Sequence, residues 1–232
     1  MLDVLRQRGL LDDNVRRRPA NNNNQDPRSD SVEQYRKRQH EKASWLWSQR
    51  RPIAGTIAET YLRSRHIICP PPLTLAFLPS RKPEHHPAMI AAFALCDEPE
   101  PGVVGEPRGV NAIHLTLLKP DGSGKAAGDK PKIIVGRPLG RPIVIAPPND
   151  LLALAIGEGI EDALTAHAAL GMGAWAAGSA DMMPALADKV PDYIEAVTVF
   201  AHADKSGQNG ARELAKRLHR RGIEIFLEGI AP

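Results

Sequence analysis

The stretch that decides the fold is VTVFAHADKSGQNGARELAKRL, residues 197–218. It opens with an unbroken apolar run, which is typical of a strand buried on both faces of a sheet. Asp204 and Gly207 follow, and from there small and apolar residues recur at helical spacing. The stretch therefore predicts a strand, a tight turn and a helix, with Asp204 at the turn.

Similar units surround this stretch. LLALAIGEG (151–159) predicts a buried strand and IEDALTAHAAL (160–170) a helix, and the next pair is MGAWAAG (172–178) and ADMMPALADKV (180–190). IEIFLEG (223–229) predicts a closing strand. Strands that alternate with helices and are apolar throughout favour an α/β fold, with a mostly parallel sheet between helices.

The region upstream does not show this alternation of strands and helices. Short apolar runs, separated by proline, glycine or charged turns, predict strands within 73–79, 88–95, 109–119, 132–136 and 142–146. PDGSG at 120–124 is a turn signal, so we expect 108–118 to pair as a hairpin with a following strand. Helices are predicted at 31–50 and 56–65, and in the first of them we expect Trp45 to pack against the domain; the alternative is that Trp45 and Trp47 stack on bases.

The N-terminus is simpler. LDVLRQRGLL (2–11) predicts a short helix, and the polar stretch 16–30 predicts a flexible linker, because it has no large apolar residues to bury. We therefore expect three parts: a flexible segment at 1–30, an α+β domain at 31–148 and an α/β domain at 149–232.

Composition restricts the class of protein. Hydrophobic residues make up 42% and charged residues 25%, which are ordinary globular proportions. A net charge of +3 does not indicate nucleic-acid binding, but the cations are clustered. Residues 1–51 hold twelve Lys or Arg against seven acids, and 119–141 holds six against two. Such clusters can follow a phosphate backbone, and the alternative is an ordinary solvated surface.

Only two cysteines are present, Cys69 and Cys96. They cannot form a zinc ribbon or a disulfide framework, so we expect no structural zinc. No apolar run reaches the roughly 18 residues of a membrane span, and the first residues lack a signal-peptide core. The sequence therefore predicts a cytoplasmic protein without a membrane partner.

Two carboxylates follow predicted strands directly. Glu158 comes after the run ALAIG, and Asp204 comes after VTVFAHA. In open α/β sheets ligands bind beyond the carboxyl ends of the strands, and two carboxylates there can hold Mg²⁺. The alternative is that both acids only cap helices.

These residues resemble a known family. GEGIEDALTA (157–166), GAWAAGSADMMPAL (173–186) and 197–218 look like the three sequence blocks of a Toprim (primase–topoisomerase) domain. The resemblance implies that Glu158 is the glutamate of the first block and Asp204 the second aspartate of an Asp-x-Asp pair. His202 then stands at the first aspartate, which implies weaker Mg²⁺ binding or a shift toward Mn²⁺. An alternative alignment starts the pair at Asp204 and ends it at Ser206, but its glycine spacing does not fit.

Other positions follow from the same resemblance. Asp162 matches an acid often found in the first block, and as a first-turn acid it could equally stabilise its helix, as could Glu161. Gly178 and Ser179 match a tight turn near the metal site, although Ser179 could simply cap a helix. Topoisomerases of this superfamily need a reactive tyrosine; the last third of the chain has only Tyr193, which we expect to pack.

Upstream, GTIAETYLRSR, PAMIAAFAL, GVNAIHLTLLKPDGSGKA and KPKIIVG are similar to the region before the Toprim blocks in primases of phages, plasmids and mobile elements. The resemblance implies primer synthesis from nucleoside triphosphates on single-stranded DNA, with a replicative helicase as a possible partner. Lys132 is then a catalytic lysine, and nucleotide or DNA phosphates are bound by Lys125, Lys130, Lys132 and Arg137. The alternatives are a Toprim nuclease and a non-catalytic protein that binds DNA or a helicase.

Overall fold

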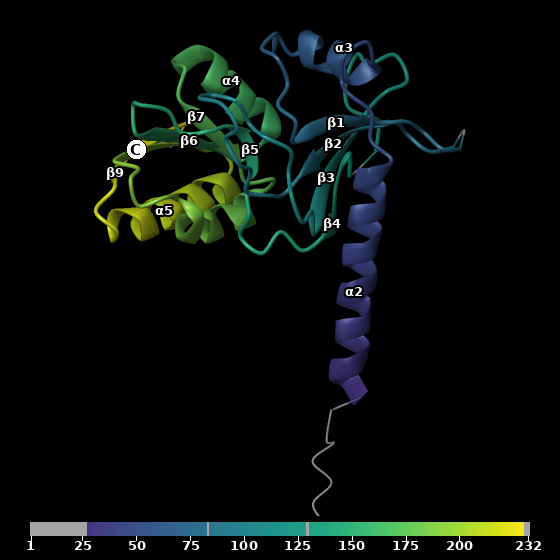
Figure 1. The fold of residues 1–232 in the computed structure, drawn as a ribbon, viewed down its shortest axis with the longest axis horizontal. Coiled ribbons are helices and arrows are strands. Elements are labelled where there is room, and N and C mark those ends of the chain that lie inside the picture. Colours follow the sequence, from purple (N-terminus) through teal and green to yellow (C-terminus); the bar gives the residue numbers. More distant parts are fainter. Residues whose placement is uncertain (1–26, 83, 129, 230–232) are drawn as a thin grey trace, which may run out of the picture. The chain divides into compact units, whose positions relative to one another are not determined.

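The computed structural model describes residues 27–82, 84–128 and 130–229 (Figure 1). The predicted helix at 2–11 and most of the predicted linker lie outside these residues. The chain divides into two compact units, Met1–Gln34 and Tyr35–Pro232. Of the first unit, the described residues form the start of helix α2 (Pro27–Ser48). This helix begins at Pro27, inside the stretch predicted as a linker.

The second unit contains two sheets, of which the first is antiparallel. Its strands are β1 (Leu75–Leu78), β2 (Ala88–Ala92), β3 (Ala112–Leu117) and β4 (Lys132–Gly136), in the order β1-β2-β3-β4. The predicted hairpin is confirmed, since β3 and β4 pair antiparallel around a loop that contains the PDGSG turn.

Two helices precede this sheet, α2 and α3 (Ile57–Ser64). On α2, Ala43 and Trp47 are buried and belong to one core cluster with Ile90 and Ile113 of the sheet. Trp45 is 45% exposed, so the expectation that it packs was wrong. Two residues rotate the helix by about 200°, so Trp45 and Trp47 cannot share a face.

The second sheet is mostly parallel, as the sequence predicts. Its strands are β5 (Ile143–Ala146), β6 (Ala153–Gly157), β7 (Gly173–Ala176), β8 (Ala196–Phe200) and β9 (Glu224–Glu228). Their order is β5-β7-β6-β8-β9, and only β5 runs antiparallel to its neighbour. Because β5 pairs with β7, the sheet begins before residue 149, the first residue of the predicted α/β domain.

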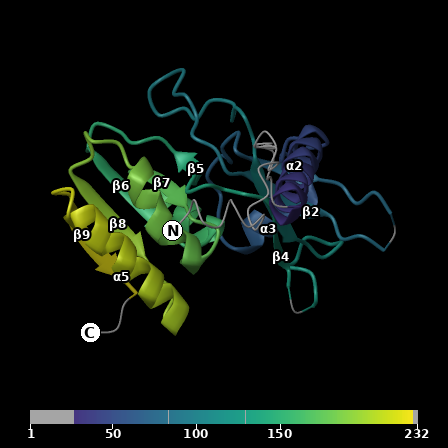
Figure 2. The same cartoon turned by 90° about the horizontal axis from the view of Figure 1, so that it is seen from below.

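Helices cover both faces of this sheet (Figures 1 and 2). Apolar residues of α4 (Ile160–Leu170) pack on one face, and those of η1 (Ala180–Lys189) and α5 (Lys205–His219) on the other. The element η1 is a 3₁₀ helix. Pro184 lies inside it, and proline in an α-helix removes a hydrogen bond and clashes with the preceding turn.

The two sheets share a core. Tyr61 and Phe93 of the N-terminal part belong to the same buried cluster as Ala155 and Leu164 of the C-terminal part. Backbone contact also joins them, because Ala94 forms an isolated parallel bridge with Ile143 of β5. The α+β part therefore packs directly on the face of the parallel sheet that carries α4.

Candidate functional site

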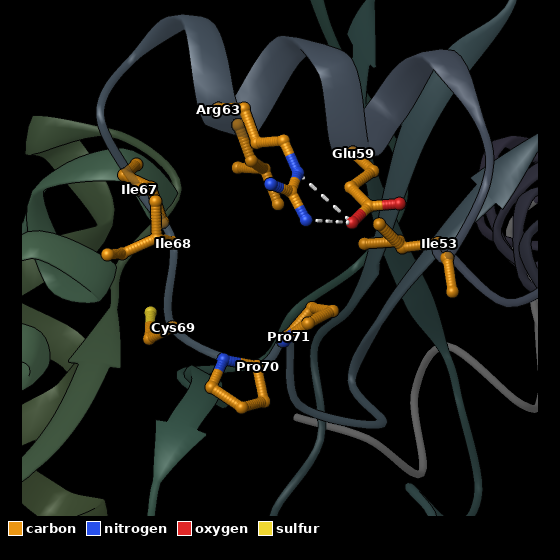
Figure 3. A pocket seen from close by; sticks show the side chains of 10 residues that line it. Ile53, Glu59, Arg63, Ile67, Ile68, Cys69, Pro70 and Pro71 are labelled. Carbon is orange, nitrogen blue, oxygen red and sulfur yellow. Dashed lines mark hydrogen bonds and ion pairs between the residues drawn. The ribbon is translucent and has the colours of Figure 1, made fainter.

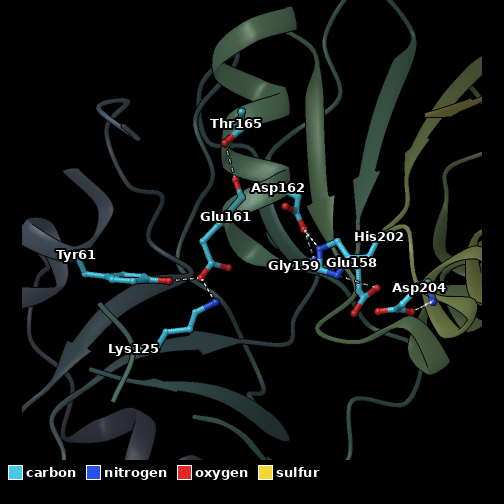
Figure 4. Close-up of polar contacts among 10 residues, drawn as sticks. Tyr61, Lys125, Glu158, Gly159, Glu161, Asp162, Thr165, His202 and Asp204 are labelled. Atoms are coloured by element: carbon cyan, nitrogen blue, oxygen red, sulfur yellow. Dashed lines mark hydrogen bonds and ion pairs between the residues drawn. The ribbon is translucent and has the colours of Figure 1, made fainter. Parts of the chain in front are cut away.

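Glu158 and Asp204 emerge at the same edge of the parallel sheet. Glu158 follows β6 directly, and Asp204 lies four residues beyond the end of β8. The two strands are parallel neighbours, with Gly157 opposite Phe200 at their ends. Figure 4 shows both carboxylates at this edge, with His202 close to Glu158.

Gly207 lies against both carboxylates. Its backbone N–H donates to Oδ1 of Asp204 at 2.8 Å. A Cβ atom at this position would lie 3.1 Å from Oε2 of Glu158 and 2.7 Å from the carbonyl oxygen of His202. A residue without a side chain is therefore what allows the two carboxylates to approach the same turn.

One side-chain oxygen of Glu158 is the strongest indication of a cation site. Its Oε2 is buried and forms no hydrogen bond with any residue that the structure describes. An unpaired carboxylate oxygen is unfavourable when buried, unless a cation or a donor satisfies it. Helix capping does not explain Glu158, since the N-cap of α4 is Gly159.

Asp204 does cap a helix, as the alternative interpretation expected. It is the N-cap of α5 through the hydrogen bond from Gly207. This bond uses Oδ1 and leaves Oδ2 available, and the residue is exposed. Capping and metal binding are therefore compatible at this position.

His202 connects two carboxylates. Its Nδ1 lies 3.4 Å from Oε2 of Glu158, and its Nε2 lies 2.9 Å from Oδ2 of Asp162. Asp162 also accepts a hydrogen bond from the backbone N–H of Gly159 at 3.1 Å. When the imidazole is protonated, it offers positive charge to the carboxylates that the sequence assigned to the metal.

The donor set suits a hard cation that keeps part of its water shell. Among the described residues, no group of three or more His, Cys, Asp or Glu side chains is arranged to enclose a metal ion. Mg²⁺ keeps several waters and is usually held by one or two carboxylates together with substrate phosphates. Glu158, whose Oε2 forms no hydrogen bond with any described residue, and Asp204 match that minimal requirement.

A second polar cluster joins α3 and the β3–β4 loop to α4. Glu161 of α4 accepts a hydrogen bond from the hydroxyl of Tyr61, and the amine of Lys125 lies 2.9 Å from the same carboxylate (Figure 4). Burial alone would raise the pKa of Glu161, but the bonds from Tyr61 and Lys125 more than reverse this and lower it to about 2. This cluster could not be predicted from the sequence, because Tyr61 and Glu161 are 100 positions apart.

Removing the Tyr61 hydroxyl tests that cluster. Tyr61→Phe keeps the ring in the core and removes one hydrogen bond to a buried carboxylate, so we expect the free energy of unfolding to fall by about 1–2 kcal/mol. Urea denaturation measures this. Tyr193→Phe, at an exposed tyrosine, is the matched control, and equal stability of the two variants would contradict the role of Tyr61.

The structure does not gather the four predicted phosphate-binding cations. Lys125 pairs with Glu161, and Lys130 is exposed in the loop before β4. Lys132 begins β4, and Arg137 follows the other end of that strand. Lys132 and Arg137 are therefore separated by the length of a five-residue strand.

His114 lies on the β3–β4 hairpin, which carries Lys125, Lys130 and Lys132 and is called the cationic hairpin. His114 packs close to the sheet edge that carries Glu158 and Asp204, called the acidic edge. It is buried on β3, and its Cδ2 lies 3.8 Å from the position of a Cβ on Gly178. Gly178 in turn donates its N–H to the carbonyl oxygen of Glu158 at 2.9 Å. Burial, followed by the charge of Lys132, lowers the pKa of His114 from 6.5 to about 4. Lys132 therefore acts electrostatically on a residue that packs beside the Glu158 turn.

This burial makes stability depend on pH. In the unfolded chain the imidazole becomes protonated as the pH falls below 6.5. In the folded chain it stays neutral until the pH approaches about 4. The stabilisation is therefore complete above pH 6.5 and is lost as the pH falls toward 4, by on the order of 3 kcal/mol. We expect His114→Gln to flatten the dependence of the melting temperature on pH between 7 and 4. The exposed His219→Gln should keep the wild-type slope, and an unchanged slope in His114→Gln would contradict the account.

Two pockets are separate from the edge that carries Glu158 and Asp204. One, of about 250 Å³, lies between α3 and Pro70-Pro71 (Figure 3). Its charged lining residues, Glu59 and Arg63, pair with each other at 2.8 Å, so it offers no free charge to a phosphate. The other, of about 270 Å³, has Asp162, His202 and Glu228 in its lining and adjoins the acidic edge.

Tyr193 lies at the opposite end of the sheet. It precedes β8, whereas Asp204 follows that strand. It is 58% exposed, so the expectation that it packs was wrong. Its place at the amino end of β8 removes it from the carboxylates, which does not favour a topoisomerase-like tyrosine.

Comparisons with known proteins agree with this geometry. Residues 153–228 match the family described as "Toprim domain", and residues 37–145 match a family described as "Domain of unknown function (DUF7146)". Searches of curated proteins and of solved structures gave no match. Within the described residues, no helix is both long enough and apolar enough to cross a membrane. Toprim domains bind Mg²⁺ through acidic residues. The chain contains a Toprim domain, which indicates a metal-dependent function related to nucleic acids.

Proposed function

We propose that this protein is a primase-type nucleotidyltransferase that makes short primers on single-stranded DNA with a divalent metal. The observation that carries the proposal is the pair Glu158 and Asp204 at one edge of the Toprim sheet, with a buried oxygen on Glu158 that forms no hydrogen bond with any described residue. The resemblance of the upstream region to primases of phages, plasmids and mobile elements supports the choice of reaction.

In this proposal Glu158 and Asp204 hold the metal, and Asp162 and His202 lie beside them. A bound Mg²⁺ or Mn²⁺ would neutralise charge on the phosphate oxygens of the nucleotide. The backbone carbonyl of Glu158 accepts a hydrogen bond from Gly178, which holds the turn that carries this side chain. The carboxylate of Asp204 is held by its capping bond from Gly207, so it needs little reorganisation when the substrate arrives.

The cationic hairpin supports a triphosphate-dependent reaction over hydrolysis. Lys132 pairs across the hairpin with Thr116, two residues along β3 from the buried His114, which packs beside Gly178. A nucleoside triphosphate carries several negative charges, and a lysine near the metal would hold it in place. We propose this role for Lys132, with Lys130 as the neighbouring cation, whereas Lys125 is engaged with Glu161.

Primer synthesis on mixed single-stranded DNA templates tests the proposal. The full chain is incubated with labelled nucleoside triphosphates and with Mg²⁺ or Mn²⁺, beside Lys132→Ala and the exposed control Lys189→Ala. We expect metal-dependent oligonucleotide products that Lys132→Ala loses and Lys189→Ala retains. Template degradation without synthesis would instead indicate a Toprim nuclease, and DNA binding without either reaction would indicate a non-catalytic protein.

A further inference from the structure

A groove on the α+β part lies outside the proposed catalytic site. It has a volume of about 760 Å³ and runs between the end of α2, the β1–β2 loop and the outer face of the antiparallel sheet. We call it the α2 groove and define it by Lys42, Trp45, Arg81, Leu115, Ile133 and Val135. The sheet residues Leu115 and Val135 belong to the core cluster that packs on α2, which is a different cluster from the one shared with the Toprim sheet.

The groove combines a flat aromatic ring with positive charge. Trp45 is 45% exposed, and the guanidinium of Arg81 lies 4.6 Å from the centre of its ring. Lys42 lines the same groove and forms no ion pair with any residue that the structure describes. Lys82 adds another cation and Glu84 the opposing acid, 3.8 Å apart and both well exposed. The lining thus carries an excess of positive charge around apolar surface.

The side of α2 that lines the groove carries further aromatic and cationic residues. Tyr35, Arg38, Lys42, Trp45 and Gln49 recur every three or four residues, so they share one side of α2. Tyr35 is 58% exposed, and ten residues of helix separate it from Trp45 by about 15 Å. Two aromatic side chains, Tyr35 and Trp45, therefore flank the cations Arg38 and Lys42 along one exposed side of α2.

This pattern favours a polyanion with flat rings over a second copy of the chain. A helix that pairs with its own copy needs apolar residues at these spacings, but Arg38 and Lys42 occupy two of the five positions. Single-stranded nucleic acid matches both features, because its bases stack on aromatic rings and its phosphates pair with Lys and Arg.

We propose that the α2 groove binds single-stranded nucleic acid, with one base stacked on Trp45 and the adjoining phosphates held by Lys42 and Arg81. Tyr35 and Arg38 extend this track along the helix. The assignment rests on the proposed function, because a protein that copies a template must also hold it away from the reacting end. The groove is therefore a template subsite of the α+β part, separate from the acidic edge of the Toprim domain.

Tryptophan fluorescence tests the groove without any catalysis. The three tryptophans are Trp45, Trp47 and Trp175, and the last two are buried. The full chain is titrated with an oligothymidylate of about 12 nucleotides, with a chelator present and no nucleoside triphosphate. We expect quenching in the wild type and none in Trp45→Phe, while anisotropy of a labelled oligonucleotide shows that Trp45→Phe still binds.

Affinity and its salt dependence then locate the contacts. Trp45→Ala should bind at least about fivefold more weakly. The double variant Lys42→Ala, Arg81→Ala should lower the slope of log affinity against log salt by about 1.4, or about 0.7 for each lost phosphate contact. The matched controls Tyr193→Ala and Lys189→Ala, at exposed positions of the Toprim domain, should bind as the wild type does.

Failure of the groove proposal can be distinguished from failure of the proposed function. Glu158→Ala should lose primer synthesis and keep the quenching, so a chain without primase activity would still show the groove contact. Wild-type affinity and salt slope in both groove variants would overturn the proposal. A change in oligomeric state in Trp45→Ala, without a change in oligonucleotide affinity, would also overturn it and assign the groove to a protein contact.

Discussion

Glu158→Gln is expected to reduce metal-dependent turnover by at least about a hundredfold, the largest effect of any single substitution considered. The amide has the shape of the carboxylate but lacks the charge that binds a divalent cation. Asp204→Asn should have a similar effect while leaving α5 intact, because asparagine is as good an N-cap as aspartate and can still accept from Gly207. Turnover is measured as labelled product per minute in saturating Mg²⁺ or Mn²⁺.

Glu213→Gln is the control for these two variants. Glu213 pairs with Arg217 on the exposed side of α5, so its loss removes a surface ion pair of little energetic value. The melting temperatures of all three variants should lie close to that of the wild type. Wild-type turnover in Glu158→Gln, in a folded protein, would show that this carboxylate is not a metal ligand.

His202→Asp is expected to raise Mg²⁺-supported turnover by about tenfold and to lower the preference for Mn²⁺ over Mg²⁺. The substitution replaces an imidazole, which suits Mn²⁺ or Zn²⁺, with the hard oxygen donor that Mg²⁺ prefers. It also removes the ring that lies 3.4 Å from Oε2 of Glu158 and competes for that oxygen when protonated. Turnover over a titration of each metal measures both effects.

His202→Asn separates these two contributions. It removes the imidazole without adding a carboxylate, so it should relieve the competition at Glu158 but not create the Asp-x-Asp pair. We expect its Mg²⁺-supported turnover to lie between those of the wild type and His202→Asp. Loss of activity with both metals in His202→Asp, but not in His202→Asn, would contradict a role for this position in metal binding.

The Toprim part was readily predicted because its signals are local. Unbroken apolar runs predict buried parallel strands, and the helix predicted at 160–170 forms with those bounds. The common location of Glu158 and Asp204 could be predicted from one rule. Side chains that follow neighbouring parallel strands lie at the same edge of the sheet. The pairing of β5 with this sheet could not be predicted, because an antiparallel edge strand has no crossover helix that indicates which sheet it joins.

Contacts between distant segments could not be predicted. Tyr61 lies in the helix predicted at 56–65, and nothing in the sequence linked its hydroxyl to Glu161. Trp45 and Trp47 differ by two positions, and which of them faces the sheet depends on how α2 is rotated against it. Arg137 appeared close to Lys132 in sequence, but an extended strand places them at opposite ends.

Counting bound Mn²⁺ by electron paramagnetic resonance tests the central claim most directly, since it needs no substrate and no assumed reaction. The claim is that Glu158 and Asp204 together hold one divalent cation at the edge of the Toprim sheet. We expect the wild type and Glu213→Gln to bind one Mn²⁺ that Mg²⁺ displaces, and Glu158→Gln and Asp204→Asn to bind at least about tenfold more weakly. Equal Mn²⁺ affinity in all four proteins would contradict the account.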